Sequence, residues 1–268
     1  IYTVTDNDGD SVTRTVTVDV TDGGTPTLSA SNDLVADEDD LAAGVGDTAL
    51  GDDASALNGS FTFTKATDDF DLSTLTLSTG ATGLTTLDGT AVVTTWDATN
   101  DVLIGYKTGG SSTTLADQVF TISITNLGQS GADYDLVLLQ AVTHSVTDDP
   151  STLLVETAFE DNVTIPALDV SVSLEDIDGS EGTTSFTIEI DDDVPVASDY
   201  DHASAITEGS GAQSLGDAVS NLGLDGGADG FDSALTAIVF SNQGSTGGTL
   251  AINGAGNLIY TVPANVDN

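Results

Sequence analysis

The chain has 268 residues, of which 44 are acidic and only 3 are basic, and its net charge at pH 7 is -41. A charge of this size and sign repels nucleic acids and anionic membranes, which argues against both as partners. Hydrophobic residues make up 38% of the chain, which is enough for real cores, so disorder is disfavoured as well. The acid excess has two compatible interpretations, namely solubility in salty surroundings and cation binding.

Three further features of the composition concern the setting of the protein. The chain has no cysteine, so bound metal could take over the stapling role that disulfides have in secreted domains. It shows no signal peptide and no apolar run near about eighteen residues, so we expect no direct membrane insertion. Because Ile1 falls inside a strand-like pattern, we expect a segment of a longer polypeptide.

The first predicted element is a hairpin that ends a preceding β module, residues 1–24. Its turn carries Asp6, Asp8 and Asp10 at alternate positions, followed by the alternating run Thr15–Val20 and then Asp22. Alternate carboxylates are typical of calcium loops, although this loop lacks the glycine and glutamate positions of an EF-hand. We therefore predict calcium ligands at all four aspartates.

A complete module is predicted over residues 25–194. Its strands show apolar alternation in runs of about four to eight residues bounded by Gly, Asn, Asp or Pro, as in Val102–Tyr106, Phe120–Ile124 and Leu168–Leu174. That spacing predicts an antiparallel β-sandwich of immunoglobulin or cadherin type. The fold class is thus all-β, with tandem sandwich modules joined by calcium-bound linkers.

The acidic turn occurs a second time near the end of this module. Asp6, Asp8 and Gly9 match Asp176, Asp178 and Gly179 at an offset of 170 residues. A repeat of this length indicates tandem domains. Residues 195–268 are therefore predicted to be the N-terminal part of the next module, in which Ser214–Asn221 could form a short helix.

Three consecutive aspartates, Asp191, Asp192 and Asp193, lie between the last strand of the module and Pro195. Two unit charges at 4 Å repel by about 4 kcal/mol at an effective dielectric constant near 20, and a bound calcium ion would offset this cost. We predict that calcium at this joint is held by these three residues together with Asp176 and Asp178. The alternative is an acidic turn without metal.

Two glutamates are also predicted to lie at the joints. Glu38 and Glu208 follow Pro26 and Pro195 at similar distances along the chain, and each is predicted to reach back to the joint that precedes it.

Other chemistry-bearing residues form no recognisable catalytic pattern. His144 is predicted to pack or form a hydrogen bond at a strand end, and no zinc or Ser/His/Asp spacing surrounds it. With 44 carboxylates, no single acid pair can be selected for glycoside hydrolysis. Gly226–Asp232 is faintly similar to the glycine-aspartate repeat of RTX proteins, but it occurs once and is interpreted as a loop. The sequence therefore predicts no enzyme.

The segment Asp133–Ser145 resembles the strand and turn of type I secretion target repeats, which build the stalks of giant RTX-type bacterial adhesins. Asp176–Gly179, Phe186–Ile190 and Asp192–Pro195 are similar to the boundary signature of those repeats, and the resemblance covers most of residues 25–194. Val142-Thr143-His144 departs from the usual Leu-Asp-His pattern, and Gly23 and Gly24 replace acids at the first joint.

The resemblance implies a secreted, calcium-stiffened extender on a bacterial cell surface, whose partners are the neighbouring repeats of the same chain. It would project a distal binding domain for attachment or biofilm formation. An alternative is a module that itself binds a glycan or peptide through loops such as Gly109–Ala116 or Leu127–Asp133. A hydrolase domain is a third, disfavoured interpretation because no catalytic constellation stands out.

Overall fold

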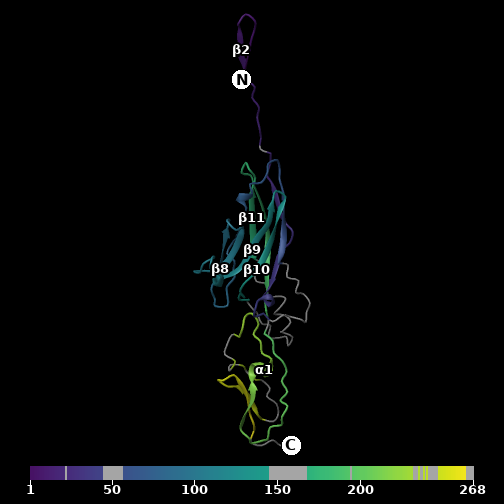
Figure 1. Ribbon diagram of the computed structural model, residues 1–268, viewed down its shortest axis with the longest axis vertical. Helices are drawn as coiled ribbons and strands as arrows, with labels where there is room; N and C mark the ends of the chain where they lie inside the picture. The colour runs from purple at the N-terminus through teal and green to yellow at the C-terminus, as the bar shows by residue number, and fades with distance from the viewer. Residues whose placement is uncertain are drawn as a thin grey trace.

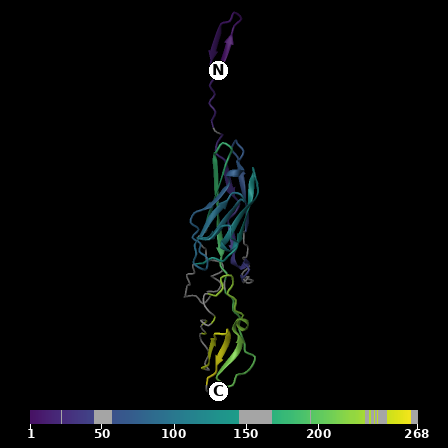
Figure 2. The same ribbon diagram turned by 60° about the vertical axis from the view of Figure 1, so that its left-hand side comes forward.

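The protein is described by a computed structural model that is almost entirely β-structure in several, mostly antiparallel sheets, as the sequence predicts. Figures 1 and 2 show an elongated molecule with a hairpin at the N-terminal end, a large pair of sheets in the middle and a small sheet at the other end. The residues that the structure describes are 1–21, 23–44, 57–144, 168–193, 195–231, 235, 238, 240 and 247–263.

The strands alternate between buried and exposed side chains where the sequence does; in the strand Leu168–Glu175, for example, the apolar residues are buried. The described strands in chain order are β1 (Tyr2–Thr5), β2 (Ser11–Arg14), β3 (Thr27–Ala30), β4 (Leu34–Asp37), β5 (Asn58–Thr64), β6 (Thr76–Thr79), β7 (Val92–Asp97), β8 (Val102–Lys107), β9 (Gln118–Gly128), β10 (Gly131–Leu138), β11 (Leu168–Glu175), β12 (Glu181–Asp191), β13 (Ala212–Asp217), β14 (Thr249–Ile252) and β15 (Asn257–Thr261). The helical segments are the 3₁₀-helices η1 (Glu38–Asp40), η2 (Leu72–Thr74) and η3 (Leu115–Asp117) and the α-helix α1 (Ala218–Leu222).

The N-terminal hairpin pairs β1 with β2 in antiparallel register, and all of its residues are exposed. The predicted strand over Thr15–Val20 is wrong, because these residues are exposed and form no strand. Among the described residues no neighbouring strand satisfies the backbone groups of this segment, and no apolar face covers Val16, Val18 and Val20. Alternation alone does not make a strand without such a partner.

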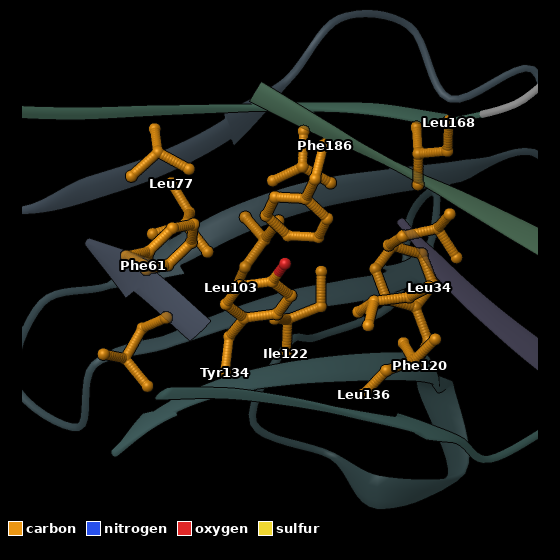
Figure 3. Packing of buried hydrophobic residues seen from close by; sticks show 14 of the residues in the cluster. Leu34, Phe61, Leu77, Leu103, Phe120, Ile122, Tyr134, Leu136, Leu168 and Phe186 are labelled. Atoms are coloured by element: carbon orange, nitrogen blue, oxygen red, sulfur yellow. The ribbon is translucent and has the colours of Figure 1, made fainter. Parts of the chain in front are cut away.

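Ten strands form two sheets that pack face to face, and we call this part the sandwich. One sheet has the order β3-β5-β10-β9-β8-β7 and the other the order β4-β12-β11-β6. They share one hydrophobic core, in which Tyr134 of the first sheet stacks on Phe186 of the second with ring centroids 4.5 Å apart. Phe61 adds a third ring, 4.4 Å from Tyr134 (Figure 3). Interlocked rings of this kind fix how the two sheets face each other.

The chain passes from one sheet to the other at the start of the sandwich. β3 pairs antiparallel with β5. β4 instead pairs parallel with β12, the last strand of the sandwich, and their register runs from Leu34 opposite Ile188 to Asp37 opposite Asp191. Between them, the carbonyl oxygen of Asn32 accepts a hydrogen bond of 2.6 Å from the Tyr134 hydroxyl. Because β4 and β12 run in the same direction, the residues that follow them meet at the same end of the sandwich.

The third part of the chain has a small sheet with the order β13-β15-β14 and a small core of Ala218, Ile252 and Leu258. The helix α1 begins after Asp217, whose carboxylate accepts a hydrogen bond from Ser220 N, and ends at Gly223 in the left-handed region. The short helix suggested by the sequence is therefore present only in its second half, because β13 takes Ala212–Asp217 into the sheet.

Candidate metal centre at the joint

The cluster of interest lies where β4 and β12 end and the following part of the chain begins. Glu38 follows β4 directly in η1, Asp192 follows β12 directly, and His144 lies between them. One ligand atom from each of these three residues lies within 4.8 Å of those of the other two. We call Glu38, His144 and Asp192 the joint centre.

Glu38 is fully buried, which is rare for a carboxylate. Its Oε1 atom accepts a hydrogen bond of 2.8 Å from the backbone N–H of Val142 and lies 3.2 Å from His144 Nε2. Its Oε2 atom is also buried and has no hydrogen-bond partner among the described residues. Burial raises the pKa of this carboxyl, against the opposing effects of His144 and the Val142 N–H.

Asp192, which follows β12, is a second buried carboxylate beside His144. Its Oδ1 atom is buried without a hydrogen-bond partner among the described residues and lies 3.9 Å from His144 Nε2. Burial raises the pKa of Asp192 to about 6, and the neighbouring His144 only partly opposes this. Two desolvated carboxylates that share one imidazole are costly unless further positive charge is present, and a cation would supply it.

The next part of the chain closes over the joint centre. The carboxylate of Asp193 accepts a hydrogen bond from the backbone N–H of Ala228, and Gly227 approaches that carboxylate so closely that a Cβ would overlap it. Burial raises the pKa of Asp229, while His144 and a side-chain contact with Glu38 oppose this shift. A cation in the joint centre would therefore act between the sandwich and the segment that follows it.

Two further carboxylate clusters use oxygen atoms alone. One consists of Asp6, Asp8 and Asp10 in the turn between β1 and β2, where all three are exposed. The other joins Asp176 and Asp178, in the turn between β11 and β12, with Asp68. Because calcium prefers carboxylate and carbonyl oxygens, both sets of residues are suited to hold it.

The two acidic turns have the same local structure. Asp6 Oδ1 accepts a hydrogen bond of 2.9 Å from Asp10 N, and Asp176 Oδ1 accepts one of 2.9 Å from Ser180 N. Gly9 and Gly179 both take positive φ angles, of 104° and 93°. The pKa values of Asp6 and Asp176 are lowered, first by side-chain contact with Asp8 and Asp178 and then by backbone hydrogen bonds. The match at an offset of 170 residues is thus also a structural match.

The predicted grouping of Asp176 and Asp178 with Asp191, Asp192 and Asp193 is wrong. The turn that carries the first pair precedes β12 and the three aspartates end it, so the 11 residues of β12 separate them. At a rise of about 3.3 Å per residue this distance is about 36 Å. Asp191 itself is half-buried at the end of β12, where it lies opposite Asp37.

The prediction for Glu38 also needs correction. Glu38 does not reach back to the first joint but lies at the opposite end of the sandwich, beside Asp192, because β4 leads it there. Glu208 is exposed, and the next residue, Gly209, donates a hydrogen bond to the carbonyl oxygen of Pro263; the proximity of Glu208 to a joint stays a prediction. Asp22 lies outside the described residues.

Sequence reasoning missed three participants, namely His144 as a neighbour of two acids, Asp68 and Asp229. A signal for the last two existed, because the string Asp68-Asp69-Phe70-Asp71 resembles Asp229-Gly230-Phe231-Asp232. Each copy follows a residue that contacts a joint: Thr67 donates a hydrogen bond of 3.1 Å to the carbonyl oxygen of Gly23, and Ala228 contacts Asp193. No local signal links His144 to Glu38.

No protein-family model matches this chain. No curated protein matches it either.

Within the described residues, no helix is both long and apolar enough to span a membrane. Fold and site together define an all-β protein with acidic clusters that could bind a metal ion.

Proposed function

We propose that this chain is a non-catalytic, calcium-stiffened extender segment of a large secreted adhesin on a bacterial cell surface. It would project a distal binding domain for attachment or biofilm formation, with the neighbouring repeats of the same chain as its partners. The observation that carries a cation-held joint is the pair of buried carboxylate oxygens, Glu38 Oε2 and Asp192 Oδ1, that have no hydrogen-bond partner among the described residues where the sandwich meets the following segment.

The order of the strands supports immunoglobulin-like or cadherin-like modules. In immunoglobulin domains the strands A, B, E and D form one sheet and C, F and G the other. Here β3-β5-β10-β9 and β12-β11-β6 follow these two orders, with β7 and β8 as an added hairpin and β4 as a parallel neighbour of the last strand. Because β4 runs parallel to β12, the chain enters the module at one end and leaves it at the other. A stalk of successive modules requires this arrangement.

The tandem arrangement is supported at both ends of the sandwich. The N-terminal hairpin repeats the β11–β12 turn, which ends the sandwich sequence. The segment after the sandwich begins as the sandwich does: Val196 pairs antiparallel with Asp225 as Thr27 pairs with Thr64. We therefore interpret residues 1–24, 25–194 and 195–268 as parts of three successive modules.

Stiffening follows from the electrostatics of the joints. At the second joint, the desolvated carboxyls of Glu38 and Asp192 repel each other and Asp229 unless a divalent cation balances them. At the first joint, the cluster of Asp68, Asp176 and Asp178 lies next to the Thr67–Gly23 contact and offers calcium an oxygen-only set of ligands. With cations bound both joints are held, and without them repulsion loosens both.

Small-angle X-ray scattering with calcium and then with a chelator tests the proposal. We expect a rigid, elongated particle in calcium and a broader distribution of interatomic distances after chelation, together with a lower melting temperature. The variant Asp192→Asn should respond less to the chelator at the second joint, whereas Glu181→Gln, an exposed substitution in β12, should behave as the wild type. Shape and melting temperature that are both indifferent to chelation would contradict the proposal.

A ligand-binding role of the module is the second candidate, and one feature favours it. A polar hollow is lined by Ser31, Asn32, Asn58, Gly59, Ser60, Thr125, Asn126, Asp133 and Asp135. Its hydroxyl, amide and carboxylate groups could bind the hydroxyls of a glycan, and it includes part of the loop Leu127–Asp133. Binding on a glycan array that is lost in Asn126→Ala, with unchanged scattering, would favour this role over the extender.

A further inference from the structure

We propose that the joint centre of Glu38, His144 and Asp192 is a site for a transition-metal ion, Zn²⁺, and not for Ca²⁺. The inference rests on the proposed function, in which a divalent cation holds this joint. It adds the chemical class of that cation. It also divides the metal sites of the chain into two kinds, an imidazole-carboxylate site at the joint and carboxylate sites at the acidic turns.

The first argument is the ligand set. Calcium takes about six to eight oxygen ligands, whereas imidazole nitrogen is a preferred ligand of zinc and of the neighbouring transition metals. His144 Nε2 is directed at both acids of the joint centre, and the His144 side chain is 1% exposed. A calcium ion placed between Glu38 and Asp192 would have this nitrogen in its immediate surroundings, where it needs an oxygen.

The second argument is distance. Zinc binds nitrogen and carboxylate oxygen at about 2.0–2.2 Å, so neighbouring ligands of a tetrahedral site lie about 3.3–3.5 Å apart. The separation of His144 Nε2 from Glu38 Oε1 is 3.2 Å, and that from Asp192 Oδ1 is 3.9 Å. A shift of a few tenths of an ångström in the Asp192 carboxylate brings the longer of these two distances into the zinc range, and no hydrogen bond from the described residues to Oδ1 resists it.

The third argument is that a hydrogen bond already holds one of the carboxylates of the centre in position. The N–H of Val142 fixes the Glu38 carboxylate through Oε1, the atom that lies 3.2 Å from His144 Nε2. Hydrogen bonds of this kind orient the metal-binding side chains of zinc sites. Asp192 Oδ1, which lies 3.9 Å from the same nitrogen, is buried without a hydrogen-bond partner among the described residues. Asp229, from the segment after the joint, contacts Glu38 and adds a further negative charge beside the centre.

The two acidic turns provide an internal comparison. The cluster of Asp68, Asp176 and Asp178 has three carboxylates and no imidazole. The chemistry of the ligand atoms therefore predicts that one molecule binds two different cations, calcium at the turn and zinc at the joint centre.

The test measures the binding of zinc to the whole chain by isothermal titration calorimetry, in the presence of millimolar calcium. We expect one zinc ion to bind at the joint centre without being displaced by calcium. His144→Asn should weaken zinc binding by about a hundredfold and leave calcium binding at the turns unchanged. Asp178→Asn is the matched control: it should weaken calcium binding and leave zinc binding as in the wild type.

A second measurement uses the wild type alone, so that it does not depend on a variant that fails to fold. Co²⁺ replaces zinc and absorbs visible light strongly only in four-coordinate sites, so an intense spectrum that zinc abolishes and calcium does not is the expected result. Weak, six-coordinate absorption, or displacement of the ion by calcium, would overturn the inference. If calcium alone then stiffens the joint, the proposed function survives; if no cation changes the scattering, the proposed function fails as well.

Discussion

Glu38 and His144 are 106 residues apart in the sequence, yet Glu38 Oε1 and His144 Nε2 lie 3.2 Å apart inside the joint. Neither side chain is accessible to solvent to more than 1%. The two residues come from opposite parts of the sandwich, Glu38 from the end of β4 and His144 from the segment after β10, and Asp192 joins them from β12. A buried cluster with this excess of acid is sensitive to any change in charge.

Glu38→Gln should change stability in opposite directions with and without metal. In a chelator, the substitution removes a desolvated negative charge while its amide oxygen still accepts from Val142 N, so the free energy of unfolding should rise by about 1–2 kcal/mol. With metal bound, the lost ligand should lower it. Urea unfolding under both conditions measures this, with exposed Glu181→Gln as a control that should stay within about 0.5 kcal/mol. A decrease under both conditions would mean that Glu38 only forms an ion pair with His144.

The stability of the metal-free protein should depend on the protonation of Asp192. The folded-state pKa of about 6 lies above the ordinary value of 3.8 for an aspartic acid, so the folded state binds this proton more tightly than the unfolded state does. The contribution of Asp192 is therefore fully present below about pH 4 and is lost as the pH rises through about 6.

The measurement is the melting temperature between pH 4 and pH 7 in metal-free buffer, for the wild type and for Asp192→Asn. The many other carboxylates act on both proteins alike, so the difference between the two curves isolates Asp192. We expect the wild type to lose stability relative to the variant as the pH rises. Metal affinity should change in the opposite direction. It should decrease as the pH is lowered below about 6, because the ligands must be deprotonated to bind a metal. Parallel melting curves would contradict the assignment.

The calcium sites at the two acidic turns should differ in strength. Asp176 is 3% exposed and has Asp68 nearby, whereas the matching Asp6 lies in an exposed hairpin. Asp176→Asn keeps an oxygen that can accept the hydrogen bond from Ser180 N but removes a charge, so calcium affinity should fall at least tenfold. Asp6→Asn should have a smaller effect. Calorimetric titration with calcium distinguishes the two, and equal effects would mean that Asp68 adds nothing.

Tyr134→Phe should destabilise the sandwich without affecting metal binding. The Tyr134 hydroxyl donates a 2.6 Å hydrogen bond to the carbonyl oxygen of Asn32 at the crossing between the sheets. Losing this partly buried hydrogen bond should cost about 1 kcal/mol, the typical net contribution of one hydrogen bond. Denaturant unfolding measures the change, and Tyr2→Phe, in the exposed hairpin, serves as the control. An unchanged midpoint would show that water replaces the hydroxyl.

Gly59→Ala should destabilise the same region by overpacking. A Cβ at Gly59 would overlap the Tyr134 ring, which the rings of Phe61 and Phe186 hold in place. We expect a loss of about 1–3 kcal/mol. At Gly80 a Cβ would meet nothing within 4 Å, so Gly80→Ala is a matched control with a small effect. Equal melting temperatures for the two variants would show that the Tyr134 ring moves easily.

The sequence by itself determined the elements whose hydrogen bonds or periodicity are local. Apolar alternation located strands such as β9 and β11, because side chains point to opposite faces at successive positions. The repeat at an offset of 170 residues predicted two acidic turns of one design, since Asp6 and Asp176 each form their hydrogen bonds within four residues. Alternation failed at Thr15–Val20, where a strand needs a partner that local sequence does not supply.

Only the tertiary structure decided which acids meet. The parallel pairing of β4 with β12 takes Glu38 away from the first joint and places it beside Asp192, and the length of β12 separates Asp178 from Asp191. His144 joins the cluster through contacts across more than a hundred residues, for which the sequence contains no period or motif. Spacing along the chain fixes which carboxylates are neighbours within a turn, whereas the direction and length of the strands fix which turns and strand ends lie together.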